Sequence, residues 1–261
     1  MKTLSSPIAQ GRTAEIYAWD DQHILKLFRE WWPSKWVDYE AGIARAVHAA
    51  GVPSPAPGEI VEINGRHGLI YERLEGISML QEMNARPWLT LKNARLLAEL
   101  QAQIHQRTIL GLPAYKERLA QDIRNTSHLR EDQRERVLAL LATLPDDQKL
   151  CHGDFHPGNI LLTKRGPVII DWLTACTGSP WADVARTLVI GNVGVKTAGD
   201  QISPVTKMFV RLYFQIYRNH YNALLPDTQK LIQRWIPVVA AARLNEDIAL
   251  EREALRSLVV R

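Results

Sequence analysis

The chain has 261 residues, of which 46% are hydrophobic and 23% charged, proportions that are ordinary for a soluble globular protein and exclude extensive disorder. The net charge of +4 comes without a block of five or more Lys and Arg, so no nucleic-acid partner is expected. Two cysteines, no apolar run of about 18 residues and no apolar N-terminal leader predict a cytoplasmic protein without a disulfide framework or a membrane partner.

The first predicted elements are strands. Residues 8–19 alternate between apolar and polar side chains, with an interruption at Gly11. A glycine there would let backbone N–H groups approach a phosphate closely, with the Thr13 hydroxyl nearby. Residues 23–28 form the next strand, in which Lys26 shares one face with apolar side chains.

A helix is expected over residues 34–50, with Ser34 as its cap. Its apolar stripe contains Trp36, Glu40, Ile43 and Val47. Glu40 and Lys26 are therefore opposite charges on two buried faces, and they are expected to form an ion pair because an unpaired buried charge is costly. The alternative is that both side chains reach solvent as surface charges.

Residues 59–63 and 67–73 are predicted to form a hairpin around the Asn64-Gly65 turn. Residues 71–76 are then expected to be a hinge between an N-terminal lobe, residues 1–73, and a C-terminal lobe, residues 74–261. From residue 91 onward the pattern is mainly helical. Helices are expected over residues 91–106, 130–144, 209–225 and 231–258, and from Pro180 with Ser179 as N-cap.

Residues 151–159 read Cys-His-Gly-Asp-Phe-His-Pro-Gly-Asn and lead into a hairpin with strands at residues 160–163 and 168–170. If the hairpin is centred near Arg165, Asn159 faces Asp171, with Cα atoms roughly 4.5–5.5 Å apart. An amide oxygen beside a carboxylate forms a site of hard oxygens suited to Mg²⁺. Asp154, just before this pair, is placed to accept a proton from an attacking hydroxyl group.

An alternative chemistry for this stretch is a zinc cluster of Cys151, His152, Asp154 and His156, as in a metal-dependent hydrolase. Two of these groups are adjacent in the chain and point in different directions, and no second ligand cluster follows. His152 and His156 are instead expected to be structural groups that bond loop carbonyls. His105 is expected to be a packing or capping residue.

His-Gly-Asp, four further residues and Asn, followed by a hairpin that ends in Ile-Asp-Trp, resemble the catalytic core of aminoglycoside phosphotransferases, choline kinases and fructosamine kinases. The resemblance implies an α+β, two-lobed protein-kinase-like fold, with a small antiparallel sheet and one helix in the N-lobe and a mostly helical C-lobe. It implies that Asp154 orients the acceptor hydroxyl and that Asn159 and Asp171 hold magnesium.

The same resemblance assigns the nucleotide contacts. It implies that Lys26 reaches the α- and β-phosphates while Glu40 holds it, and that the single Gly11 corresponds to a reduced phosphate loop. It implies that backbone groups of Glu72 and Leu74 read the adenine edge. Asp183 would brace the catalytic loop from below.

The predicted function is ATP- and Mg²⁺-dependent transfer of the γ-phosphate to a hydroxyl of a small molecule, such as an amino sugar, sugar, amino alcohol or aminoglycoside-like acceptor. The alternatives are a nucleotide-binding regulator without turnover and a kinase acting on protein or a glycolipid. From Asp200 onward nine basic residues face six acidic ones. The sequence ends Leu-Val-Val-Arg, unlike the acidic, aromatic C-terminus of typical aminoglycoside 3′-phosphotransferases. Both features favour a neutral or singly charged acceptor.

Overall fold

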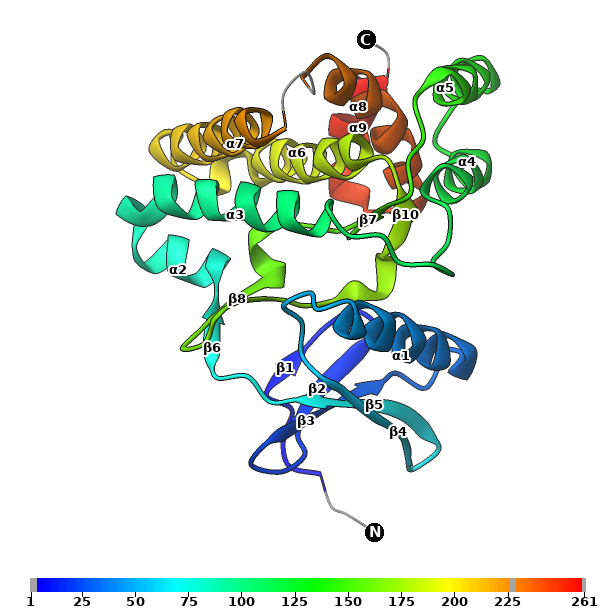
Figure 1. The fold of residues 1–261 in the computed structure, drawn as a ribbon. Helices are drawn as coiled ribbons and strands as arrows, with labels where there is room; N and C mark the ends of the chain where they lie inside the picture. The colour runs from blue at the N-terminus through cyan, green and yellow to red at the C-terminus, as the bar shows by residue number, and fades with distance from the viewer. Residues whose placement is uncertain (1–3, 226–228, 260–261) are drawn as a thin grey trace. The chain divides into compact units, whose positions relative to one another are not determined.

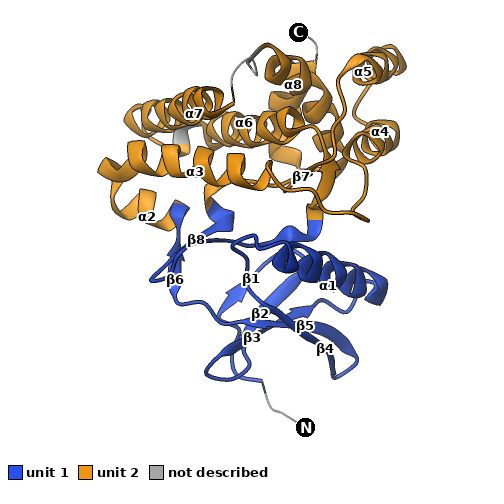
Figure 2. Ribbon diagram, viewed as in Figure 1, with its two compact units in different colours: residues 1–79, 158–173 blue, residues 80–157, 174–261 orange. Residues whose placement is uncertain are grey.

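The computed structural model describes residues 4–225 and 229–259. The chain divides into two compact units, shown in Figure 2. Unit 1 comprises residues 1–79 and 158–173, and unit 2 comprises residues 80–157 and 174–261. The chain therefore passes between the units after residues 79, 157 and 173, whereas the lobes expected from the sequence divide it once, at residue 73.

Unit 1 contains a five-stranded antiparallel sheet in the order β1-β2-β3-β5-β4 (Figure 1). Its strands are β1 (Ala9–Gln10), β2 (Ala14–Ala18), β3 (His23–Phe28), β4 (Pro57–Ile63) and β5 (Arg66–Glu72). The turn between β4 and β5 is Asn64-Gly65, and both residues have positive φ, as a two-residue hairpin turn that matches the strand twist requires.

Alternation along the strands decides which side chains lie on each face of this sheet. Phe28 and Leu69 pack against Val37 and Ala41 of α1 (Ser34–Ala49), which covers one face. The opposite face carries a second cluster around Tyr17, Leu25 and Leu27. The predicted faces of the strand over residues 23–28 are thus confirmed, because side chains in a strand alternate strictly.

The predicted helix over residues 34–50 is present, but two of its details differ. Pro33 occupies the N-cap position, and Ser34 is the first residue of the helix. Trp36 is 41% exposed and stacks edge-on against Tyr39, so it does not belong to the buried stripe. Val37 is buried in its place.

The hairpin after residues 151–159 is formed by β8 (Ile160–Thr163) and β9 (Gly166–Ile169), with β6 (Gly76–Ser78) pairing the outer edge of β8. A two-residue turn at Lys164-Arg165 pairs Thr163 with Gly166. The expected register was therefore wrong by one residue, since Asn159 receives the hydrogen bond of the Ile170 amide and does not face Asp171 directly.

Unit 2 is mainly helical (Figure 1). Its helices are α2 (Met79–Ala85, whose first residue belongs to unit 1), α3 (Thr90–Ile104), α4 (Tyr115–Asn125), α5 (Glu131–Thr143), α6 (Pro180–Ala198), α7 (Pro204–Leu224), α8 (Gln229–Arg243) and α9 (Arg252–Val259). The expectation of one helix over residues 231–258 was wrong, because η5 (Leu244–Glu246) and η6 (Ala249–Glu251) separate α8 from α9, and Asp247 has a left-handed backbone.

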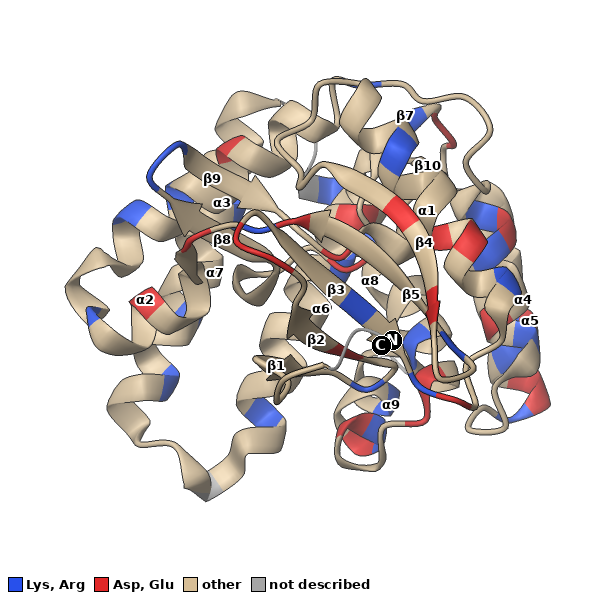
Figure 3. Cartoon of the chain, turned by 90° about the horizontal axis from the view of Figure 1, so that it is seen from below, with Lys and Arg blue, Asp and Glu red and all other residues tan. Residues whose placement is uncertain are grey.

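Charged residues of both signs alternate along α4 and α5, whose outer faces are solvated (Figure 3). A two-stranded sheet of β7 (Lys149–Cys151) and β10 (Cys176–Gly178) lies in the interior of unit 2 and pairs Cys151 with Cys176, both of which are buried free thiols. Among the helices that the structure describes, none combines the length and the apolar composition needed to cross a bilayer.

Candidate active site

Lys26 in β3 and Glu40 in α1 form an ion pair inside unit 1. The Lys26 Nζ atom lies 2.7 Å from Glu40 Oε1, and the Glu40 side chain is 2% exposed. Burial alone would lower the pKa of Lys26, but the carboxylates of Glu40 and Asp171 outweigh burial and hold this pKa above its ordinary value. The ion pair expected from the sequence is present, and the alternative of two solvated charges is wrong.

The Glu40 carboxylate has a second partner that the sequence did not indicate. The Tyr71 hydroxyl of β5 donates to Glu40 Oε1 at 3.0 Å, and burial raises the Tyr71 pKa, which keeps this donor protonated. Glu40 Oε2 is buried and has no hydrogen-bond partner within the described part of the chain. The carboxylate is therefore held from two directions at one oxygen, which fixes the position of the Lys26 ammonium group.

Asp171 follows β9 and directs its carboxylate toward the same lysine. Asp171 Oδ1 lies 3.3 Å from Lys26 Nζ, and the Asp171 side chain is 51% exposed. Its φ of 62° is uncommon for a residue other than glycine and is typical of a constrained functional position. Lys26 thus contacts one buried carboxylate and one accessible carboxylate at the same time.

Asn159 ends a 3₁₀ turn (Pro157–Asn159) immediately before β8, and it is 8% exposed. Its backbone carbonyl accepts the amide of Ile170, the residue that precedes Asp171. Asn159 and Asp171 therefore stand at adjoining ends of the two hairpin strands. An amide oxygen and a half-exposed carboxylate are hard donors, and this set fits Mg²⁺ better than a metal that prefers sulfur or imidazole.

Gly11 and Thr13 lie in the turn between β1 and β2, where the Gly11 amide donates to the carbonyl of Ala14 at 2.8 Å. A Cβ added at Gly11 would meet only that carbonyl oxygen, at the ordinary distance of 3.5 Å. The protein's own packing therefore does not require a glycine here. A role for this turn in binding phosphate stays a prediction.

Glu72 ends β5, and its carboxylate is bound to Arg165 of the hairpin turn at 2.5 and 2.8 Å. The Glu72 amide donates to the carbonyl of Ala56 at 2.9 Å. Leu74 is half-buried and follows between the exposed residues Arg73 and Glu75, before β6. Among the described hydrogen bonds and ion pairs, none joins Glu72 or Leu74 to Lys26, Glu40 or Asp171. Their role in adenine binding stays a prediction.

Asp154 belongs to unit 2 and lies in the loop between β7 and the 3₁₀ turn. Arg186 Nη2 lies 3.6 Å from Asp154 Oδ1, and His156 Nε2 lies 3.6 Å from Oδ2. Burial alone would raise the pKa of Asp154, but His156 and Arg186 outweigh burial and hold this pKa well below its usual range. The carboxylate is 31% exposed, so it is ionised and accessible.

Asp183, in the first turn of α6, supports the loop that carries Asp154. Its fully buried carboxylate accepts the backbone amides of His152 at 3.1 Å and Gly153 at 2.7 Å. Gly153 has a φ of 77°, and a Cβ there would lie 2.4 Å from the carbonyl oxygen of Thr174, so only glycine fits. The bracing contact expected of Asp183 is observed.

A buried polar network extends from Asp183 to α7. The side chains of Gln101 and His105 bond Asp183 at 3.0 and 3.1 Å, and His105 Nδ1 lies 2.6 Å from the Tyr221 hydroxyl. Burial alone would raise the pKa of Asp183, but these hydrogen bonds and the charge of His105 lower it to about 2. His105 is therefore a packing residue, as expected, with a specific polar partner.

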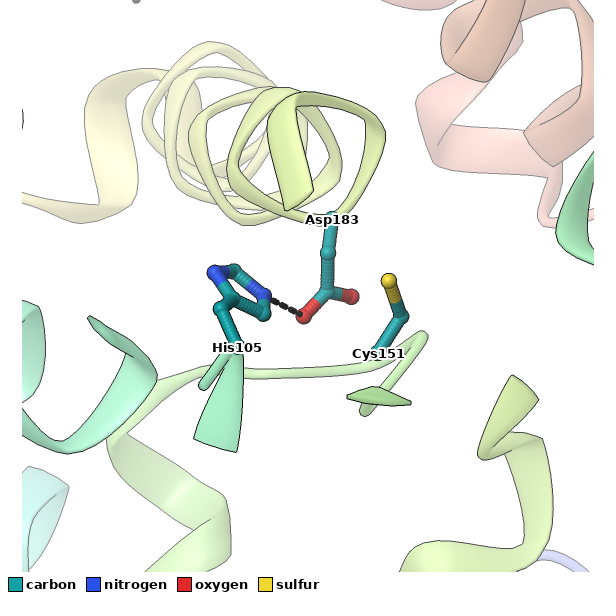
Figure 4. Close-up of side chains that lie close together, drawn as sticks. All are labelled: His105, Cys151 and Asp183. Atoms are coloured by element: carbon teal, nitrogen blue, oxygen red, sulfur yellow. Dashed lines mark hydrogen bonds and ion pairs between the residues drawn. The ribbon is translucent and has the colours of Figure 1, made fainter. Parts of the chain in front are cut away.

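The described residues contain one group of side chains with the spacing of a metal site, namely His105, Cys151 and Asp183 (Figure 4). Both ring nitrogens of His105 already have partners, and Asp183 already accepts several hydrogen bonds. The group is completely buried and is explained by these contacts. The zinc set considered from the sequence does not come together among the described residues.

Sequence reasoning missed three residues that contact this machinery: Gln101, Arg186 and Tyr221. Gln101 precedes His105 by four residues, and Tyr217 and Tyr221 are also four apart, which is the spacing of one helix face. Arg186 stands three residues after Asp183 within an otherwise apolar part of α6. A charged residue in that apolar segment was the signal that could have identified it.

The sequence model of the phosphotransferase enzyme family matches residues 5–249 of the chain. No curated relative matches the sequence. Several solved structures are similar to this one over nearly its whole length, at identities that establish the fold alone.

One such structure is a thermostable mutant of aminoglycoside phosphotransferase APH(4)-Ia in a ternary complex with AMP-PNP and hygromycin B. Its TM-score is 0.65 at 13% identity, over 99% of this chain and 94% of that chain. The streptomycin-ATP-APH(2")-IIa ternary complex has a TM-score of 0.57 at 15% identity, over 100% and 92%. Macrolide 2'-phosphotransferase MphH from Brachybacterium faecium has a TM-score of 0.53 at 18% identity, over 98% and 92%. The expected α+β protein-kinase-like fold is confirmed.

Proposed function

The chain belongs to the phosphotransferase enzyme family, and from this membership we propose that it transfers the γ-phosphate of ATP, with Mg²⁺, to a hydroxyl group of a small molecule. The observation that carries the proposal is the contact of Lys26 with both the buried Glu40 and the accessible Asp171. A fixed ammonium group beside a carboxylate that is open to solvent suits the binding of a metal-bound triphosphate.

Residues of unit 1 bind the nucleotide in this proposal. Lys26, held by Glu40, donates to the α- and β-phosphates, and Asn159 and Asp171 hold Mg²⁺. The turn at Gly11 and Thr13 would contact the phosphates, and the backbone of Glu72 and Leu74 would bind the adenine edge. When bound, Mg²⁺ would supply neutralisation of the charge on the transferred phosphoryl group. Residues 1–73 act as the nucleotide-binding lobe, and residues 74–261 supply the catalytic loop and the acceptor site, with a hinge near residues 71–76.

Asp154 orients the acceptor hydroxyl and takes its proton. Because its pKa is depressed, Asp154 is a weak base, and it accepts the proton only after the bond to phosphorus has begun to form. Such late proton transfer agrees with the loose transition state of phosphoryl transfer, in which positioning and charge neutralisation contribute most of the catalysis. A cytoplasmic location, where ATP is available and the two buried thiols stay reduced, suits this activity.

The acceptor in this proposal is neutral or carries one positive charge. Of the acidic residues after residue 199, Glu246 and Glu251 are paired with Arg243, and Asp247 is paired with Arg252. These carboxylates are already neutralised and offer little attraction to a polycation. Asp227, Val260 and Arg261, which also entered the sequence argument, lie outside the described residues.

The test is a screen for ATP consumption with Mg²⁺ against amino sugars, neutral sugars, amino alcohols, homoserine, glycated amines and kanamycin-type aminoglycosides at matched concentrations. Asp154→Ala is the matched variant, and it should abolish transfer while ATP binding, measured by calorimetry, stays intact. Absence of turnover with every acceptor, together with tight MgATP binding, would favour a regulator. An aminoglycoside kcat/KM of about 10⁴ M⁻¹s⁻¹ or more would overturn the proposed acceptor class.

A further inference from the structure

Five side chains of alternating charge form a continuous chain in unit 2, beginning at Asp154. Arg186 of α6 contacts Asp154 at 3.6 Å and Glu246 of η5 at 2.6 Å. Arg243 of α8 contacts Glu246 at 3.1 Å and Glu251 of η6 at 2.7 Å. The catalytic loop is thereby connected, through Arg186, to the segment between α8 and α9.

Arg186 is the central member of this chain, and it is poorly solvated. Its side chain is 11% exposed, and its Nε atom is buried without a hydrogen-bond partner within the described residues. A buried guanidinium group needs carboxylate partners to offset its lost hydration. Glu246 is the close partner, and Arg243 restrains Glu246 from the other side, so the position of Arg186 is set independently of Asp154.

We propose that Arg186 is a positioning residue for catalysis, which orients the Asp154 carboxylate through Oδ1 and keeps it ionised while the acceptor hydroxyl binds. The proposal rests on the phosphotransferase function proposed above. At 3.6 Å the Arg186–Asp154 contact is longer than a hydrogen bond, whereas the Arg186–Glu246 contact is short. Arg186 therefore acts on Asp154 mainly through its charge.

The described groups of unit 2 that lower the pKa of Asp154 include side chains of α6 and of the loop that carries Asp154. Arg186 belongs to α6, and His152 and His156 belong to the same loop as Asp154. His152 is completely buried, and His156 approaches Oδ2. Of these three groups Arg186 alone carries a permanent charge, so its removal takes away the constant positive charge among them.

The first test follows Asp154 itself by ¹³C NMR of protein labelled at the Asp carboxyl carbon, with Asp154→Asn used to assign the resonance. In the wild type we expect no titration of Asp154 between about pH 4 and 6, and in Arg186→Gln we expect titration in that range, at or above the ordinary Asp pKa. Arg186→Lys should resemble the wild type. Repeating the titration in a His156→Gln background separates the contribution of that ring. Titration of Asp154 in the wild type above pH 4, or none in Arg186→Gln, overturns the inference.

The second test measures turnover with the best acceptor from the screen, or slow MgATP hydrolysis by water. Arg186→Ala should lower kcat about 100-fold, as expected when a catalytic group is misplaced, and leave the KM for ATP unchanged. Guanidinium at millimolar concentration should restore part of this loss. Arg134→Gln is the matched control, because Arg134 is a partly buried, paired arginine of α5 that lies outside the ion chain.

The outcomes separate the two proposals. A wild type that transfers phosphate while Arg186→Ala keeps its kcat refutes the role of Arg186 alone. Suppose that the wild type shows no turnover, while Asp154 titrates between about pH 4 and 6 in Arg186→Gln and not in the wild type. This result refutes the phosphotransferase function alone. If Arg186→Ala loses activity that guanidinium does not restore, and Arg186→Lys is equally inactive, Arg186 is structural. This result also overturns the inference.

Discussion

Replacement of Asp183 by Asn tests a buried carboxylate of unit 2 that accepts several hydrogen bonds. The Asp183 carboxylate accepts hydrogen bonds from at least four donors: the amides of His152 and Gly153, and the side chains of Gln101 and His105. Each hydrogen bond to a charged group contributes about 1.5–3 kcal/mol, and removing one partner from a buried pair costs about 3–5 kcal/mol. We expect Asp183→Asn to lower the free energy of unfolding by about 3–5 kcal/mol at pH 7, because an amide places its NH₂ group against N–H donors.

The pH dependence of stability gives an independent measure of the same interaction. Because the pKa of Asp183 is lowered from 3.8 to about 2, its ionised form stabilises the folded state above about pH 4, and this stability is lost as the pH falls through about 2. The difference corresponds to about 2 kcal/mol. The free energy of unfolding of Asp183→Asn should therefore depend less on pH than that of the wild type between pH 5 and 2.

The assay is equilibrium urea unfolding followed by circular dichroism at several pH values. Asp132→Asn is the control, because the exposed Asp132 carboxylate of α5 pairs with the surface arginines Arg130 and Arg136, and loss of such exposed pairs should change stability by less than about 1 kcal/mol. A loss below about 1 kcal/mol in Asp183→Asn, or an unaltered pH profile, would refute the view that this carboxylate holds the loop that carries Asp154.

Three further predictions concern the proposed site. Asp171→Ala should weaken Mg²⁺-dependent ATP binding as well as turnover, and calorimetry that finds an unchanged MgATP affinity would place the metal elsewhere. Glu40→Gln should raise the KM for ATP and lower kcat because Lys26 loses its buried counter-ion, and steady-state kinetics with Lys26→Ala should give a similar pattern. Gly153→Ala should reduce turnover and thermal stability together, since its Cβ would collide with the Thr174 carbonyl, and a variant of unchanged activity and melting temperature would contradict this packing.

Much of unit 1 was predictable from the sequence because its information is local. Strict alternation over residues 23–28 defines two faces, and the Asn64-Gly65 pair specifies a tight hairpin. Two opposite charges on apolar faces indicated the Lys26–Glu40 pair, since burial without a partner is costly. The resemblance of residues 151–172 to a known family was recognisable because the spacing of the motif and the hairpin after it lie within about twenty residues.

Other features depend on contacts between residues that are distant in the chain. The exposure of Trp36 follows from which helix face meets the sheet, and helical spacing leaves a choice between neighbouring residues. The register of the β8–β9 hairpin shifted by one residue because the turn contains two residues, a detail that a Lys-Arg-Gly sequence does not specify. The sequence also contains no signal strong enough to separate α8 from α9.

The sequence by itself indicated the fold class and the family through a resemblance that a short motif carries. It also indicated the charged residues from which the site is proposed, because short-range spacing is a property of the chain. Only the tertiary structure decided what surrounds those residues. Gln101 and Tyr221 join His105 and Asp183 through the packing of α3, α6 and α7, and Arg186 meets Asp154 and Glu246 across three segments. Such contacts arise from how helices pack, and packing depends on the shapes of all the buried side chains together.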